Sequence, residues 1–220
     1  MKSILIIGMG KIGQHLCRKL LDLDNEVMII DQNEEAIREF FTEVTSARIG
    51  DCTNPDVLQA LGLNNFDVVI VTIKDDFQNS LEVTNLAKEQ GAKYVISFAS
   101  RDIQAKFLLK NGADEVIYPE RDVAHNLAAR CSANNVFEYM ELDDEYSIVE
   151  VPILKSWAGK TIREIGVQAQ YGINIIGVVR NGVTNIMPTA DYEFIPGDHM
   201  QIISNRDAAE RLLKAIDKGL

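Results

Sequence analysis

The first part of the chain contains the pattern that most restricts its fold. An apolar run at residues 4–7 leads into G-x-G-x-x-G, with glycines at positions 8, 10 and 13. Glycines at this spacing allow a tight turn, a close approach of the backbone to a phosphate, and close packing of the next helix on the sheet. A second apolar run ends on Asp31, and an acid about 20 residues beyond such glycines reaches the hydroxyls of a ribose. The pattern therefore predicts a nucleotide site.

The residues expected to contact this nucleotide follow the ends of four predicted strands. A helix beginning near Lys11 directs its free N–H groups and the positive end of its dipole toward the phosphates. Ligands of open α/β sheets bind at the carboxyl edge of the strands. We therefore expect the nucleotide to contact Gly8, Met9, Gly10, Lys11, Ile12, Gly13, Asp31, Asp51, Cys52, Thr53, Thr72 and Ile73.

Two interpretations of Asp51 and Thr53 are open at this point. Both residues follow the third predicted strand, where Asp51 accepts a hydrogen bond from an adenine amino group and Thr53 supplies a hydroxyl. Alternatively, they form a turn and a helix cap before Pro55.

Composition limits the class of protein. The 220 residues are 46% hydrophobic and 25% charged, which is ordinary for a globular protein of one large domain or of a standard domain plus a small one. The longest apolar runs are strand-length, so we expect neither a membrane span nor a signal peptide. The three cysteines form no CxxC pair, which argues against a zinc site or a disulfide framework. A net charge of −11 argues against nucleic acid as a partner.

The distribution of apolar runs predicts the fold class. Strand candidates alternate with helical patterns at 3–7, 26–31, 45–49, 67–73, 93–98 and 115–118. This alternation predicts an α/β fold with a Rossmann-like, doubly wound parallel sheet.

The pattern then changes to that of a small α+β C-terminal domain. We expect one long helix at 121–139, strands at 146–153, 173–180, 183–187 and 199–204, a short helix at 161–170 and a final helix at 207–217. The pair Asn181-Gly182 between two apolar runs is a strong hairpin signal. We place the domain boundary in 136–145, which gives a nucleotide-binding domain at 1–135 with its crossover helix and a ligand-binding or dimerisation domain at 136–220.

Several of these motifs together resemble a known family. They are Gly8 to Gly13, Asp31, Gly50-Asp51-Cys52-Thr53, Gly112-Ala113-Asp114, the block from Tyr118 to Asp122, the run from Tyr146 to Glu150, Gly159-Lys160-Thr161-Ile162 and Pro196-Gly197-Asp198. Over essentially its whole length, the chain resembles the cytosolic RCK (regulator of K⁺ conductance) subunits of Trk/Ktr-type potassium-uptake systems.

The resemblance implies a nucleotide-binding gating subunit that controls K⁺ transport through a separate membrane subunit. That subunit would be a potassium channel or transporter of the TrkH/KtrB kind, with this chain in the cytoplasm, peripheral to the inner face of the membrane. Family members form homodimers that build octameric rings. The implied ligand is NAD(H) or ATP/ADP, with Lys11 near the terminal phosphate and Glu120 near a divalent cation such as Mg²⁺ or Ca²⁺. For Glu120, an exposed acid that stabilises a helix dipole is the alternative interpretation.

The resemblance also implies a second ligand site. In similar proteins, paired C-terminal domains bind cyclic di-AMP between them. The corresponding pocket here would contain Ile162, Ile173, Asn174, Ile175 and Pro188. A dry dimer core, with Asn174 as a turn residue, is the alternative for the same residues.

Two other classes of function are possible from the nucleotide motif alone. An NAD-dependent oxidoreductase with a minimal second domain needs an acid or base against the nicotinamide. The three histidines, His15, His125 and His199, share no metal-ligand spacing and no recognisable catalytic pattern. A scaffold that binds no ligand would leave the phosphate loop and Asp31 unexplained. We therefore expect a regulator that is not an enzyme.

Overall fold

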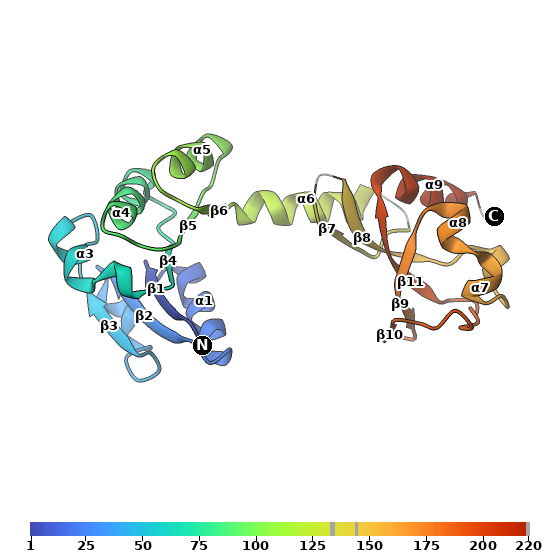
Figure 1. Ribbon diagram of the computed structural model, residues 1–220, viewed down its shortest axis with the longest axis horizontal. Coiled ribbons are helices and arrows are strands. Elements are labelled where there is room, and N and C mark those ends of the chain that lie inside the picture. The colour runs from blue at the N-terminus through green and yellow to red at the C-terminus, as the bar shows by residue number, and fades with distance from the viewer. Residues whose placement is uncertain (133–134, 144, 219–220) are drawn as a thin grey trace. The chain divides into compact units, whose positions relative to one another are not determined.

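The computed structural model describes residues 1–132, 135–143 and 145–218. The chain forms two compact units, Met1–Glu120 and Arg121–Leu220, which are coloured blue to green and green to red in Figure 1. No described helix is long and apolar enough to cross a membrane.

The first unit is built on a six-stranded sheet in which every pair of neighbouring strands is parallel. In the order β3-β2-β1-β4-β5-β6, its strands are β1 (Ser3–Ile7), β2 (Glu26–Asp31), β3 (Ser46–Ile49), β4 (Val68–Val71), β5 (Val95–Phe98) and β6 (Glu115–Ile117). The connecting helices are α1 (Lys11–Asp22), α2 (Glu34–Arg38), α3 (Pro55–Leu61), η1 (Leu63–Asn65), α4 (Phe77–Glu89) and α5 (Asp102–Lys110).

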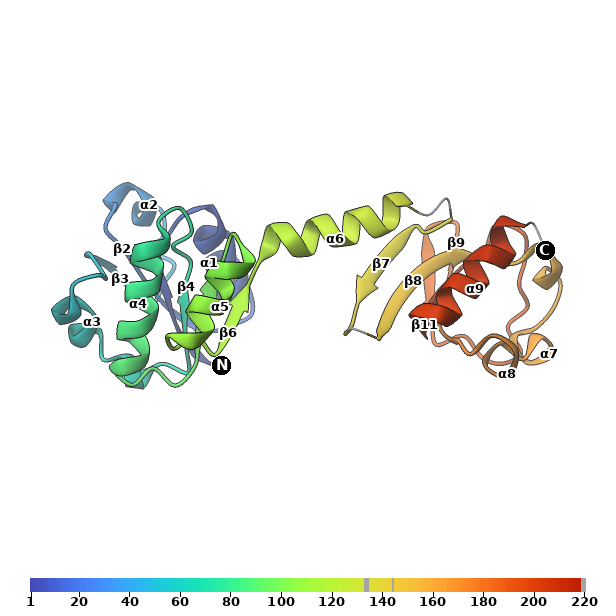
Figure 2. The same cartoon turned by 90° about the horizontal axis from the view of Figure 1, so that it is seen from above.

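Helices cover both faces of this sheet (Figure 2). On one face, Ile4, Ile6 and Ile29 pack with Cys17 of α1 and Ile37 of α2. The other face packs against α3 and α4, because neighbouring strand residues point to opposite sides. This arrangement confirms the expected doubly wound α/β fold.

The order of the strands creates a crevice at one edge of the sheet. Strand β1 pairs with β2 on one side and with β4 on the other. The chain therefore leaves β1 in one direction and later returns on its opposite side. Ligands of such sheets bind at this point of reversal, outside the carboxyl ends of the strands.

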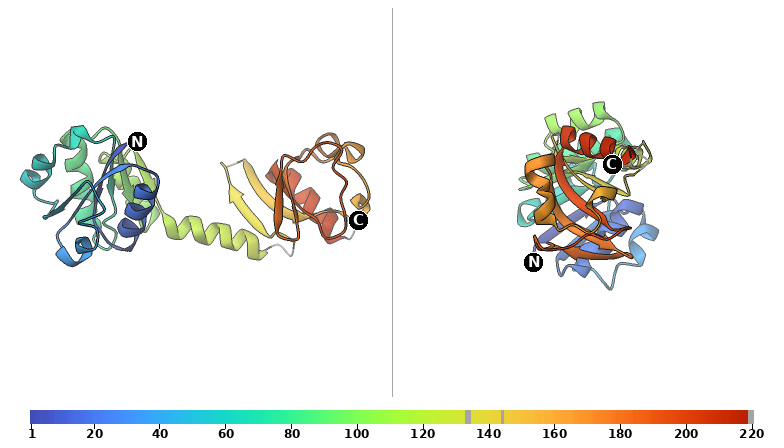
Figure 3. Two further views of the ribbon diagram at one scale, coloured as in Figure 1. Left: turned by 90° about the horizontal axis from the view of Figure 1, so that it is seen from below. Right: turned by 90° about the vertical axis from the view of Figure 1, so that its right-hand side faces the viewer.

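The second unit, coloured yellow-green to red in Figure 3, contains a five-stranded antiparallel sheet in the order β10-β9-β11-β8-β7. Its strands are β7 (Glu138–Glu141), β8 (Tyr146–Pro152), β9 (Asn174–Arg180), β10 (Val183–Ile186) and β11 (His199–Asn205). Its helices are η2 (Lys155–Trp157), α7 (Ile162–Ile165), α8 (Val167–Tyr171) and α9 (Arg206–Asp217), while α6 (Pro119–Ser132) leads into it from the first unit.

One face of this sheet carries the core of the second unit. Val149, Val151, Met200 and Ile202 alternate inward along β8 and β11 and pack with Leu212 of α9. Trp157 and Tyr171 also belong to this cluster, and their rings meet edge to face at 5.2 Å between centroids. The small α+β domain expected from the sequence is thus present.

The structure corrects the long helix expected at 121–139. Helix α6 ends at Ser132, and Glu138–Glu141 is strand β7, which pairs with β8. Its sequence, EYME, lacks a β pattern of its own, so its conformation depends on a partner that is distant in sequence. The helix expected at 161–170 is interrupted at Gly166, whose φ of +62° lies in the left-handed region.

The division between the units also differs from the boundary expected in 136–145. It falls at Glu120/Arg121, so most of α6 groups with the second unit. Two side chains of α6 explain this grouping. His125 contacts Glu141 at 2.9 Å, and Arg130 contacts Glu138 at 3.7 Å, both on β7.

A buried carboxylate connects the loops of the second unit. The Asp198 side chain is fully buried and accepts two hydrogen bonds from the Arg180 guanidinium, each 2.8 Å long. It also accepts from the Tyr192 hydroxyl and the Ile195 N–H. Burial acts to raise the pKa of Asp198, but these hydrogen bonds outweigh it and hold the pKa below its ordinary value.

We predict that Asp198→Asn destabilises the second unit by about 3 kcal/mol, because the buried side chain loses its charge and one of its two acceptor oxygens while its donors remain. A carboxylate with a lowered pKa stabilises the fold above its ordinary pKa, and this stabilisation is lost as pH falls through the lowered value. The wild type should therefore lose stability below about pH 4, and the variant should lack this part of the pH dependence. Denaturation followed by the fluorescence of Trp157, the single tryptophan, measures both effects.

The matched control is Asp191→Asn. Asp191 pairs with Arg163 at 3.0 Å, but both side chains are mostly exposed, at 75% and 67%. Exposed pairs of this kind contribute about 0.2–1 kcal/mol. Equal destabilisation by the two substitutions would contradict the role assigned to Asp198.

Candidate functional site

A cavity of about 310 Å³ lies at the carboxyl edge of the parallel sheet, where the chain leaves β1, β2, β3 and β4. It brings together eight of the residues that the sequence predicts as nucleotide contacts. They are Gly8, Gly10, Asp31, Asp51, Cys52, Thr53, Thr72 and Ile73.

The glycine loop is shaped by two crowded positions and one open position. Gly8 has a φ of +98°, a conformation that favours glycine. A Cβ on Gly13 would lie 2.3 Å from the Gly8 carbonyl oxygen, so α1 approaches the turn more closely than any other residue would allow. At Gly10, which caps α1, a Cβ would meet nothing within 4 Å. The loop thus leaves space beside the first turn of α1, where a phosphate fits.

Asp31 connects the end of β2 to the glycine loop. Its Oδ2 accepts a 2.5 Å hydrogen bond from the Met9 N–H, and its Oδ1 accepts a 2.8 Å bond from the Asn33 N–H. The carboxylate is therefore held in one orientation at the wall of the cavity. A carboxylate held in this way is suited to accept hydrogen bonds from the hydroxyls of a ribose.

Asp51 and Thr53 form a local turn after β3. Asp51 Oδ1 accepts from the Thr53 N–H at 3.0 Å and from its hydroxyl at 2.8 Å, and these bonds lower the pKa of Asp51. The cap of α3 is instead Asn54, whose side chain accepts from the Asp56 N–H. The turn interpretation therefore describes the backbone, while both side chains still line the cavity.

Cys52 and Thr72 form inner walls of the cavity. Burial, together with the charges of Asp51 and Asp31, raises the pKa of Cys52 to about 12, so its thiol stays protonated near neutral pH. The Thr72 hydroxyl donates to the Gly8 carbonyl at 2.5 Å. Thr72 thus supports the glycine turn from the end of β4.

Four of the predicted contact residues do not line this cavity: Met9, Lys11, Ile12 and Gly13. Met9 and Gly13 are buried under the loop, Ile12 is half-buried against the core, and Lys11 is exposed at the start of α1. Met9 still contributes its N–H, through the bond to Asp31. Lys11 lies outside the cavity within this single chain.

The prediction missed four residues of the lining: Gln32, Asp75, Asp76 and Asn79. All of them follow the ends of β2 or β4, so the rule that ligands bind at the carboxyl edge could have included them. The Asp76 side chain accepts from the Asn79 N–H and thereby caps α4. Ile7, Ile30, Gly50 and Lys74 complete the lining.

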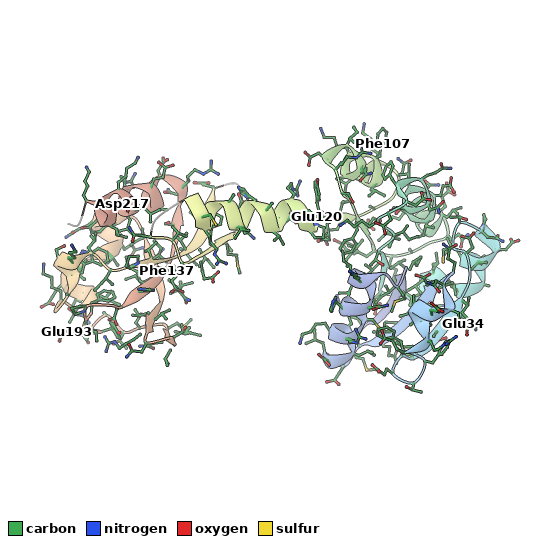
Figure 4. The ribbon with its side chains drawn as sticks, turned by 180° about the vertical axis from the view of Figure 1, so that it is seen from behind. Glu34, Phe107, Glu120, Phe137, Glu193 and Asp217 are labelled. Atoms are coloured by element: carbon green, nitrogen blue, oxygen red, sulfur yellow. The ribbon has the colours of Figure 1, made fainter. Side chains whose placement is uncertain are left out.

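Glu120, the candidate cation ligand, forms an ion pair with Lys74. Figure 4 labels Glu120 at the beginning of α6. Within the described parts of the chain, no group of three or more His, Cys, Asp or Glu side chains is arranged to hold a metal ion. Among the described residues, Glu120 therefore has a basic partner and belongs to no such group.

A second hollow, of about 410 Å³, lies in the second unit. It brings together all five residues predicted for the second ligand: Ile162, Ile173, Asn174, Ile175 and Pro188. Ile173 is fully buried, whereas Asn174 is exposed at the start of β9. The hollow therefore combines an aliphatic wall with an accessible amide.

Comparison with protein families identifies the chain. Residues 4–119 match the TrkA-N domain, and residues 147–217 match the TrkA-C domain. The chain belongs to the TrkA family. These matches cover the parallel-sheet unit with its cavity and the core of the antiparallel-sheet unit.

Several relatives of this TrkA-family chain are potassium uptake proteins. The chain is 35% identical over 215 residues to the Ktr system potassium uptake protein C of Bacillus subtilis. The aligned region covers 98% of this chain and 97% of the relative. The chain is 28% identical to the Ktr system potassium uptake protein A of Vibrio alginolyticus, with 98% of each chain covered.

Solved structures share the fold. The GsuK channel matches with a TM-score of 0.71 at 20% identity, over 96% of this chain and 39% of that chain. The GsuK RCK domain matches with a TM-score of 0.66 at 19% identity, over 98% of this chain and 46% of that chain. The fold of this TrkA-family chain is therefore that of an RCK domain.

We predict opposite outcomes for alanine at two glycines of the loop. Gly13→Ala should lower the free energy of unfolding of the first unit by about 1–3 kcal/mol, because its Cβ would collide with the Gly8 carbonyl. Gly10→Ala is the matched control. Its Cβ meets no atom and its φ is −63°, so its stability cost should stay below about 1 kcal/mol. Thermal unfolding of the full chain compares the two; a larger loss at Gly10 would contradict this packing.

Proposed function

We propose that this chain is the nucleotide-binding regulatory subunit of a potassium-uptake system. The observation that carries the proposal is the cavity formed by the glycine loop and Asp31 in a chain 35% identical to a Ktr system potassium uptake protein. A nucleotide that binds one conformation of a regulator more tightly shifts its population toward that conformation. The resulting change in the membrane subunit would be the output.

The proposed ligand is an adenine nucleotide, either NAD(H) or ATP/ADP. The loop offers space beside the first turn of α1 for phosphates, and Asp31 offers a fixed acceptor for a ribose. Both ligand types carry these two groups. The GsuK channel, which shares the fold, has been solved bound to NAD.

Regulation by binding requires no catalytic group, and the potassium-uptake relatives favour this role over hydride transfer. Among the lining residues of the cavity, the ionisable side chains are four aspartates, Lys74 and the protonated Cys52, with no histidine among them. A dehydrogenase needs an acid or base placed against the nicotinamide and a pocket for a second substrate. The favoured proposal is therefore binding without consumption.

A divalent cation near Glu120, Mg²⁺ or Ca²⁺, is a further part of the proposal. Within one chain, Glu120 contacts Lys74. A cation site that includes Glu120 would need the carboxylate to exchange this lysine for the cation and to gain ligands from the nucleotide or from a second chain.

We propose a membrane-embedded potassium channel or transporter subunit as the partner, with this chain peripheral to the cytoplasmic face of the membrane. The chain itself is proposed to form a homodimer that assembles into an octameric ring. Exposed apolar side chains support such contacts. Val123 and Leu127, four residues apart on α6, are 65% and 51% exposed, and Ile103 and Phe107 on α5 are 53% and 46% exposed.

Cyclic di-AMP is proposed as the ligand of the second hollow. Its residues Ile162, Ile173 and Ile175 offer an apolar wall for a base, and the exposed amide of Asn174 can hydrogen-bond the edge of that base. The hollow, of about 410 Å³, is open to solvent, which suits a ligand shared with a second copy.

We predict that Asp31→Ala weakens binding of NAD and ATP by about 1.5–3 kcal/mol, because the ribose loses its charged acceptor. NADP should bind more weakly than NAD to the wild type, because a 2′-phosphate would face the same carboxylate. Calorimetric titration of the full chain measures both differences.

Glu34→Gln is the control, because Glu34 is exposed on α2 and does not line the cavity. Cyclic di-AMP gives a second control, since its proposed hollow is in the other unit and its affinity should not change in Asp31→Ala. Undiminished NAD and ATP affinity in Asp31→Ala, or equal affinity of the wild type for NAD and NADP, would contradict the proposed site.

A further inference from the structure

We propose that Lys74 reads the phosphate charge of the bound nucleotide, and that Glu120 at the start of α6 competes with the phosphates for it. This inference rests on the proposed nucleotide site and adds a specificity-determining residue to it. Its basis is an ion pair that joins the cavity wall to the helix leading into the second unit.

Lys74 follows the two residues of the chain that pack on the glycine loop. A Cβ added to Gly8 would lie 3.0 Å from the Thr72 hydroxyl and 3.3 Å from an Ile73 side-chain carbon. The segment that follows β4 therefore packs directly on the turn that follows β1. Lys74 is the next residue along this segment and lines the cavity. From this wall of the cavity its ammonium reaches the Glu120 carboxylate at the start of α6, within the same lining that includes Gly8 and Gly10 of the phosphate loop.

The charge of the lining makes Lys74 distinctive. It is the single cationic residue among the described residues that line the cavity, beside Asp31, Asp51, Asp75 and Asp76. These carboxylates repel a phosphate, whereas an ammonium attracts it. The discrimination between nucleotides of different phosphate charge should therefore depend on Lys74 more than on any other lining side chain.

The Lys74 ammonium already has an anionic partner within the protein. It pairs with Glu120, and the two side chains are 26% and 52% exposed, so water only partly screens them. A phosphate that approaches Lys74 brings negative charge toward the Glu120 carboxylate. The contact of Lys74 with phosphate and its contact with Glu120 should therefore weaken each other.

This competition would link the phosphate charge of the ligand to the contacts made by the first turn of α6. Glu120 is the second residue of α6, and the second compact unit begins at the next residue. A nucleotide with more phosphate charge would release Glu120 from the end of β4, whereas a nucleoside would leave the pair intact. The same cavity could in this way produce different outputs from ligands with the same adenosine group.

The test is calorimetric titration of the full chain with ATP, ADP and adenosine, in buffer with a chelator so that no divalent cation is present. Lys74→Gln should weaken ATP binding about tenfold, and ADP binding less, with adenosine unchanged. Lys74→Arg keeps the charge and should retain most of the ATP affinity. Glu120→Gln should tighten ATP binding about threefold, because it frees the ammonium and removes a repelling charge.

The double variant separates competition for Lys74 from simple repulsion by Glu120. Competition predicts that Glu120→Gln has a much smaller effect when Lys74 is already Gln. Lys93→Gln and Asp67→Asn are matched controls, since this exposed pair, 3.4 Å apart, lies outside the cavity lining. They should change no affinity. Thermal unfolding verifies that every variant is folded.

Two results would overturn the inference while leaving the nucleotide site standing. The first is a Lys74→Gln variant that binds ATP as tightly as the wild type does. The second is that Glu120→Gln tightens ATP binding by the same factor whether residue 74 is Lys or Gln. Failure of the wild type to bind adenosine, ATP and NAD would instead remove the proposed function, and this inference with it.

Discussion

The close approach of α1 to the turn after β1 is the constraint on which the first unit depends. It is possible because residue 13 has no side chain: the position of a Cβ there is 2.3 Å from the Gly8 carbonyl oxygen. The same carbonyl accepts from Thr72, and the Met9 N–H in the same turn donates to Asp31. This turn therefore fixes the ends of β1, β2 and β4 relative to one another. The cavity exists because these three ends are held close together while Gly10 leaves space between them.

The second unit is organised around a polar contact instead. Asp198 is buried in a loop and connects Arg180 at the end of β9 with Tyr192 and the Ile195 N–H. The apolar cluster around Trp157 and Leu212 supplies most of the driving force for packing. The carboxylate determines how the loop before β11 lies on that cluster. Its hydrogen bonds hold a charge in the interior, and this explains the direction in which its pKa is shifted.

Local chemistry explains which features could be predicted from the sequence. The glycines at 8, 10 and 13 and the acid at the end of β2 impose their geometry within a short stretch of chain. Asn181-Gly182 does the same for the hairpin, where both residues have positive φ, at 51° and 76°. The five residues of the second hollow were located through family resemblance, and the structure places them together. Strand β7 was missed because Glu138–Glu141 becomes a strand through pairing with β8, a contact that its own residues do not signal. The Lys74–Glu120 pair was missed for a similar reason, since it joins residues that only the finished sheet brings together.

The central claim is that this TrkA-family chain converts nucleotide binding into a change in potassium flux without consuming the nucleotide. The most direct measurement is K⁺ flux into vesicles that contain the cognate membrane subunit, with this protein added in the presence of NAD, NADH, ATP or ADP. The nucleotide is quantified before and after. The account predicts that flux differs between ligands while each ligand is recovered unchanged, and that Gly10→Ala, which fills the space beside α1, removes the difference. The account would be contradicted by flux that is identical with and without every nucleotide, or by turnover of the nucleotide that accompanies the flux.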